Sequence, residues 1–94
     1  MLSIVSWNIQ SARSPSGGAD LDGVLACIDR FAPEADVLCL QEVACGFRAR
    51  DGSPGGDQFA GLVRRLAGWH CASAHAVDTL APDGGRRRLG SVVF

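Results

Sequence analysis

Val37-Leu38-Cys39-Leu40-Gln41-Glu42-Val43 is the stretch that decides the fold, because it is an apolar run that ends in two polar side chains. A second run, Ser6-Trp7-Asn8-Ile9-Gln10, lies closer to the N-terminus and places Asn8 at its polar end. Buried strands read as near-continuous apolar runs, so both stretches predict strands. Ligands of open α/β sheets bind beyond the carboxyl ends of the strands. Asn8 and Glu42 are therefore predicted to lie at a ligand-binding edge.

The residues between the two runs predict a helix that joins parallel strands. We expect a strand at residues 2–9 and a loop at residues 11–19, which are rich in Ser, Gly and Pro. Asp20 suits the N-cap of the helix, and Pro33 ends it. The apolar stripe of this helix comprises Leu21, Val24, Leu25, Ile28 and Phe31. A strand–helix–strand order favours a right-handed crossover between parallel neighbours, which would bring the two polar run ends to the same end of the sheet.

The remainder of the chain predicts one more helix and two more strands. Residues 44–56 form a Gly-rich connector, and residues 57–67 form a helix with the apolar stripe Phe59, Leu62, Val63 and Leu66. Strands at residues 69–76 and 86–94 flank the turn signal Asp83-Gly84-Gly85. The last residues are apolar, and no turn or polar tail follows them. We interpret the chain as a domain that is truncated at its C-terminus.

The composition is that of a globular chain. Its 94 residues fit at most one domain, and 47% of them are hydrophobic against 20% charged. A net charge of -1 gives no global basic signal for nucleic acid. The four cysteines have irregular spacings without a Cys-x-x-Cys pair, which favours reduced thiols over a zinc site or disulfides. With no signal-peptide pattern and no apolar run of about 20 residues, we expect a cytoplasmic protein without a membrane span.

The paired motifs resemble a known superfamily. Trp7-Asn8-Ile9 followed by Leu38-Cys39-Leu40-Gln41-Glu42-Val43 resembles the start of the endonuclease/exonuclease/phosphatase superfamily, the DNase I-like metal-dependent phosphoesterases. Pro33-Glu34-Ala35-Asp36-Val37 resembles the approach to its second strand, and Leu89-Gly90-Ser91-Val92-Val93-Phe94 resembles a later strand. The resemblance implies an α/β (α+β) fold in which residues 1–94 are the N-terminal part of a four-layer α/β/β/α sandwich. Later His- and Asp-containing motifs of the family do not occur in this sequence.

The resemblance also implies a chemistry, the hydrolysis of phosphate esters by water activated on Mg²⁺ (or Mn²⁺). Glu42 would be the principal metal ligand, and Asn8 would supply an oxygen directly or through a hydrogen bond to a ligand. Gln41 would be a structural hydrogen-bonding residue, because side chains alternate along a strand. Arg13 is a weaker candidate for contact with the substrate phosphate, and Arg48 and Arg50 are weaker still. The Arg86-Arg87-Arg88 run could contact phosphates, but a solvated hairpin is the preferred interpretation.

Several alternatives stay open at this point. His70 and His75 lie in no matching motif, so no catalytic residue is assigned and the chain alone is expected to be inactive. An isolated Asn after a strand is usually a turn residue, and an isolated Glu there is usually solvated; only the paired motifs favour a metal site. The chain could instead be a non-catalytic relative that acts as a binding module, or a partial gene product without a function of its own. The expected partner is a phosphate-ester substrate, with nucleic acid among the candidates, and no oligomeric state is predicted.

Overall fold

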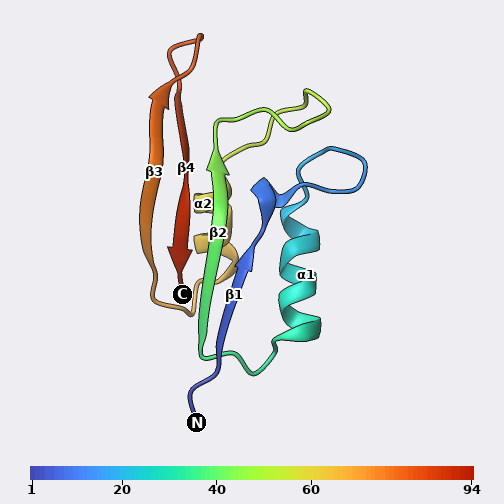
Figure 1. The fold of residues 1–94 in the computed structure, drawn as a ribbon, viewed down its shortest axis with the longest axis vertical. Coiled ribbons are helices and arrows are strands. Elements are labelled where there is room, and N and C mark those ends of the chain that lie inside the picture. The colour runs from blue at the N-terminus through green and yellow to red at the C-terminus, as the bar shows by residue number, and fades with distance from the viewer.

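The computed structural model describes residues 1–94, and one four-stranded sheet organises them (Figure 1). The elements in chain order are β1 (Ile4–Asn8), a short 3₁₀ turn η1 (Gln10–Ala12), α1 (Leu21–Phe31), β2 (Val37–Cys45), α2 (Gln58–Arg65), β3 (Ala72–Leu80) and β4 (Arg86–Val93). The strand order across the sheet is β1-β2-β4-β3. Strands β1 and β2 are parallel, whereas β4 runs antiparallel to both of its neighbours. The predicted α/β fold class is confirmed.

The parallel pairing of β1 and β2 sets the geometry of the candidate site. Asn8 is the register partner of Gln41, and the Ile9 N–H donates to the Gln41 carbonyl oxygen at 3.0 Å. Strand β1 ends at Asn8, whereas β2 continues alongside β4 to Cys45, and the segments that follow the two strands project on the same side of the sheet (Figure 1). Asn8 is the last residue of β1, but Glu42 lies inside β2, so the prediction that both residues end their strands is correct for Asn8 only.

Helix α1 begins and ends as its sequence predicts. The Asp20 carboxylate accepts a hydrogen bond from the Gly23 N–H at 2.9 Å, which satisfies one of the free donors of the first turn. The helix ends at Phe31, two residues before Pro33. Phe31 was predicted to be part of the buried stripe, but its exposed fraction is 74%. It is the last residue of the helix, and its ring lies beside the guanidinium of Arg30 instead.

Both helices pack on one face of the sheet. Leu38 and Leu40 of β2 are fully buried against this layer, together with Leu62 of α2 and residues of α1. The register places Ile4 and Val93 beside the alternate residues of β2, on the opposite face, where both are exposed. The structure thus shows a layer of helices and a sheet, while the further layers of the expected sandwich stay a prediction. Neither helix is long and apolar enough to cross a membrane.

Helix α2 is shorter than predicted, and one residue of its predicted apolar stripe does not reach the core. Asp57 is its N-cap, with its carboxylate accepting from the Ala60 N–H at 3.0 Å. The buried residues are Gln58, Gly61 and Leu62, whereas Val63 has an exposed fraction of 46%. The prediction of Val63 as a core residue is therefore wrong. The burial of a glutamine in its place has a structural reason, which lies in the candidate site.

Candidate functional site

Glu42 lies in a β-bulge of β2. Leu40 pairs with Val92 of β4 but Val43 pairs with Gly90, so two residues of β2 face one residue of β4. In a regular strand Glu42 would follow Leu40 onto the buried face, because side chains on alternate residues share a face. The bulge puts Val43 there and leaves Glu42 exposed. The position of this carboxylate at the surface is therefore a product of the bulge.

The bulge holds Glu42 in an unusual backbone conformation. Its φ is 55°, in the left-handed region, which costs a residue with a Cβ about 1–2 kcal/mol. Such strain persists where the surrounding structure enforces it, and it clusters at functional sites. Its neighbour Gln41 has the structural role that the sequence predicted. The Gln41 amide donates to the Ser6 hydroxyl at 3.1 Å and to the Cys39 carbonyl oxygen at 2.9 Å.

Asn8 is fixed at the end of β1 by its own turn. Its Oδ1 accepts a hydrogen bond from the Gln10 N–H at 2.9 Å, which is the turn role of an isolated asparagine. An amide oxygen has two lone pairs, so one remains for a cation or its water. The next residues of η1, Gln10, Ser11 and Ala12, have φ values of 52°, 56° and 56°. Strained backbone therefore occurs at two places, in the turn that follows Asn8 and in the bulge at Glu42.

Gln58 connects these two strained segments, and no sequence pattern predicted it. Its side chain is buried, and its Nε2 donates to the Ser11 carbonyl oxygen at 2.7 Å. Its Oε1 accepts from the Ala44 N–H at 3.0 Å. One amide side chain of α2 thus joins the turn after Asn8 to the end of β2 that bears Glu42. The only signal in the sequence is a polar residue directly after the N-cap of a helix.

We expect Gln58→Leu to lower the free energy of unfolding by about 2 kcal/mol, because it leaves the buried Ala44 N–H without an acceptor and removes the bond to Ser11. Urea unfolding followed by circular dichroism measures this. Gln58→Glu is the matched control, since its carboxylate can still accept from Ala44 but cannot donate to Ser11 when ionised. The free energy of unfolding of Gln58→Glu should lie between that of wild type and that of Gln58→Leu. A Leu variant as stable as wild type would contradict this role of Gln58.

The arginines predicted as phosphate contacts have different surroundings. Arg86 and Arg88 pair with Asp78 at 2.8 and 3.6 Å, and Arg87 lies 5.4 Å from the ring centroid of Phe47. Desolvation raises the pKa of Asp78, but the hydrogen bond and the charge of Arg86 outweigh this effect and hold the pKa below its usual value. These internal partners agree with the preferred interpretation of a hairpin. Arg13 and Arg50, by contrast, line one polar hollow near the end of β1.

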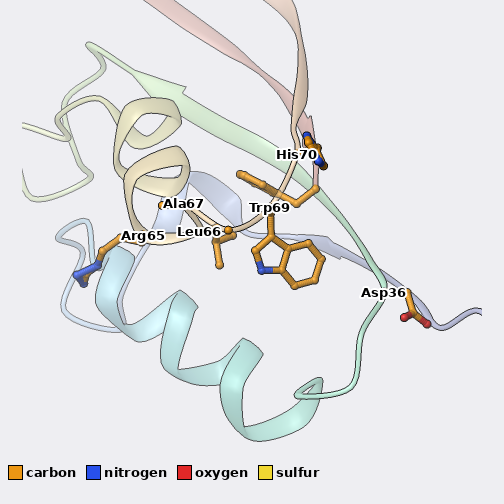
Figure 2. Close-up of a pocket in the computed structure, with 8 residues that line it drawn as sticks. Asp36, Arg65, Leu66, Ala67, Trp69 and His70 are labelled. Carbon is orange, nitrogen blue, oxygen red and sulfur yellow. The ribbon is translucent and has the colours of Figure 1, made fainter.

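A larger hollow lies elsewhere in the molecule. It has a volume of about 480 Å³ and includes Leu66, Trp69 and His70. Figure 2 shows Leu66 and Trp69 close together below the end of α2, with Asp36 set apart at the start of β2. Phe94 completes this lining and pairs with Leu38, at the end of β2 opposite to the bulge. This hollow is separate from the candidate site, because Asn8 and Glu42 are at the other end of the sheet.

The two histidines occupy places that separate them from Glu42. His70 lines the hollow at the opposite end of β2. His75 lies on β3, with β4 between it and β2, and its ring packs edge-on against Phe59 at 4.8 Å between centroids. Neither is positioned at the bulge as a general acid or base.

The donor atoms at the bulge suit a hard cation. The chain contains no group of three or more His, Cys, Asp and Glu side chains that could hold a metal, and all four cysteines are free. The donors at this edge are the Glu42 carboxylate and Oδ1 of Asn8. Mg²⁺ prefers oxygen ligands and retains several waters, so one or two carboxylates suffice for it. A closed tetrahedral zinc site would need four ligands that this edge does not offer.

Comparisons with known proteins bear on the fold of the chain. A scan against protein-family models and a search of curated proteins found no match. Among solved structures, the chain is similar to the crystal structure of an endonuclease/exonuclease/phosphatase from Beutenbergia cavernae DSM 12333, with a TM-score of 0.73 and 29% sequence identity. The match covers 98% of this chain and 25% of that one. This likeness in fold and sequence supports the resemblance to the endonuclease/exonuclease/phosphatase superfamily, to which the chain is a partial match.

Proposed function

We propose that this chain is part of a Mg²⁺-dependent phosphoesterase in which Glu42 and Asn8 hold the cation. The observation that carries the proposal is the bulge, which exposes Glu42 at a cost in backbone strain beside the end of the strand that bears Asn8. Backbone strain clusters at functional sites, and the exposed Glu42 carboxylate has no hydrogen-bond partner in the protein that would explain the strain. Its solved relative is an endonuclease/exonuclease/phosphatase, which supports phosphate-ester hydrolysis as the reaction class. Mn²⁺ would serve as the alternative cation.

Glu42 and Asn8 would have different roles in this reaction. A divalent cation here would neutralise charge on the phosphoryl oxygens and make a bound water more acidic. The Glu42 carboxylate supplies the negative charge that holds such a cation. Because the Asn8 amide is planar and its Oδ1 is bound to the Gln10 N–H, its Nδ2 has a fixed direction from which it can donate to a phosphate oxygen. Asn8 would therefore orient the substrate as well as contribute an oxygen.

We further propose that the 94-residue chain alone is inactive. A positioned general acid or base contributes about 10²–10⁴-fold to rate, and neither His70 nor His75 is placed to act at the bulge. The expected result is no detectable hydrolysis of bis-p-nitrophenyl phosphate in the presence of Mg²⁺. Mg²⁺-dependent turnover that disappears in Glu42→Ala would contradict this expectation.

Cation binding can be tested without activity. We expect added Mn²⁺ to broaden the amide NMR signals around Asn8 and Glu42 before any others, and Glu42→Gln to remove this effect. Glu34→Gln is the matched control, because it removes the same charge from an exposed glutamate in the loop before β2, at the far end of the sheet. Broadening that persists in Glu42→Gln, or that starts at another site, would overturn the metal-site proposal.

A further inference from the structure

Two loops beyond the ends of β1 and β2 together form a polar hollow. The first follows η1 and the second follows β2, and both project on the same side of the sheet (Figure 1). The Asp51 N–H of the second loop donates to the Gly17 carbonyl oxygen of the first at 3.2 Å, which joins them. The hollow has a volume of about 340 Å³, and no hydrophobic residue lines it. Its polar lining includes Arg13, Ser14, Ser16, Arg50 and Asp51.

The two arginines of this hollow have no anionic partner in the protein. Arg13 donates only to the neutral side-chain oxygen of Gln10, at 3.1 Å, and Arg50 makes no side-chain hydrogen bond or ion pair. By contrast, Arg65 pairs with Asp22, and Arg86 and Arg88 pair with Asp78. Two guanidinium groups without anionic partners in one small hollow suit an anion, because their forked donors match the oxygens of a phosphate.

The remaining polar groups are compatible with an anion. The hydroxyls of Ser14 and Ser16 are 2.9 Å apart, so one can donate to the other while the second hydrogen stays free for a ligand. Asp51 is the one acidic residue of the lining, and its Oδ1 accepts from the N–H and hydroxyl of Ser53. These bonds hold the pKa of Asp51 below its usual value, so its charge remains and partly offsets the arginines.

Hydrogen bonds connect this hollow with the candidate cation site. The Gln10 N–H donates to Oδ1 of Asn8, and the Gln10 side-chain oxygen accepts from Arg13. Asn8 and Arg13 are thus both held by one residue, at the same edge of the sheet. A molecule bound at Asn8 and Glu42 would have the hollow beside it.

We propose that the hollow between Arg13 and Arg50 binds a second phosphate group of the substrate, separate from the phosphate ester that would be hydrolysed at Glu42. The substrate class would then be compounds with at least two phosphate groups. This inference rests on the proposed function. The second group could be another phosphate monoester of a small molecule or a neighbouring phosphodiester of an oligonucleotide, and the chemistry of recognition is the same for both.

The first test is a titration of the 94-residue chain with inorganic phosphate in the absence of metal. NMR signals of the arginine side-chain N–H groups monitor the binding. We expect Arg13→Gln and Arg50→Gln each to weaken binding about 10-fold, as for loss of a charged hydrogen bond. Arg64→Gln is the matched control, since Arg64 is exposed on α2 without an ion pair and its loss changes net charge equally. Asp51→Asn should strengthen binding. Equal affinity in all variants would overturn the proposal.

The second test asks whether the hollow serves the substrate. With Mn²⁺ present, hexane-1,6-diol bisphosphate should bind more tightly than hexyl phosphate, because two linked groups bind two sites, and Arg50→Gln should remove this advantage. A thymidine tetranucleotide tests the phosphodiester source in the same way. If neither ligand gains over hexyl phosphate, the hollow is no substrate site and the proposal fails. Absence of Mn²⁺ broadening at Glu42, with arginine-dependent phosphate binding intact, would overturn only the proposed function and leave the phosphate site standing.

Discussion

Replacement of Glu42 by glycine is expected to abolish cation binding at the bulge and to make the chain more stable. Glu42 has a φ of 55°, which costs a residue with a Cβ about 1–2 kcal/mol and costs glycine almost nothing. Glycine loses more backbone entropy on folding, so the net gain in the free energy of unfolding should be about 0.5–1 kcal/mol. The side chain is exposed, so its removal leaves no cavity to offset this gain.

Two measurements on the same variants separate the functional and structural effects of Glu42. Urea unfolding reports stability, and Mn²⁺ broadening of amide signals reports the cation. Glu42→Gln is the matched control, because it loses the charge but keeps a Cβ in the left-handed conformation, and it should lose Mn²⁺ without gaining stability. A glycine variant that is less stable than wild type would mean that the Glu42 side chain stabilises the fold. The strain would then carry no argument for function.

The placement of Glu42 beside the end of β1 could be predicted because it depends on local signals. Two apolar runs with a capped helix between them favour parallel strands, and parallel strands end at the same edge. The bulge at Glu42 was not predicted, although the spacing of the apolar residues in this run indicates it. Leu38 and Leu40 alternate, but the next apolar residue is Val43, one position out of step. A shift of one residue in register moves every later side chain to the other face unless a bulge absorbs it.

The parts of the site that the sequence did not predict depend on contacts between distant segments. Gln58 is buried because its amide matches two backbone groups far from it in sequence, and a hydrophobic pattern carries no information on such matches. Arg13 and Arg50 line the same hollow because a backbone hydrogen bond from the Asp51 N–H to the Gly17 carbonyl oxygen joins their loops. Val63 was predicted to be buried from its spacing alone, but α2 has only eight residues and its first turn already contributes Gln58 to the core.

Gly90→Ala is expected to cause the largest loss of stability among single substitutions considered for this chain. A Cβ at Gly90 would lie 1.9 Å from the Ala74 carbonyl oxygen and 2.8 Å from the Cα of His75. Both are backbone atoms of β3, so no side chain can move aside to relieve the overlap. Strand β3 would have to separate from β4 at this point. We expect the free energy of unfolding to fall by more than about 3 kcal/mol, above the usual cost of overpacking.

Gly68→Ala is the control for this substitution, because no atom lies within 4 Å of the position of its added Cβ. Its unfolding free energy should stay within about 0.5 kcal/mol of wild type. Gly90 also pairs with Val43, the residue after Glu42, and the register of β3 on β4 shifts beside it. We therefore expect the folded fraction of Gly90→Ala to bind Mn²⁺ more weakly than wild type, although Glu42 is intact. Unchanged stability with unchanged Mn²⁺ binding would show that the close approach of β3 to Gly90 does not maintain the bulge, and that β2 alone positions Glu42.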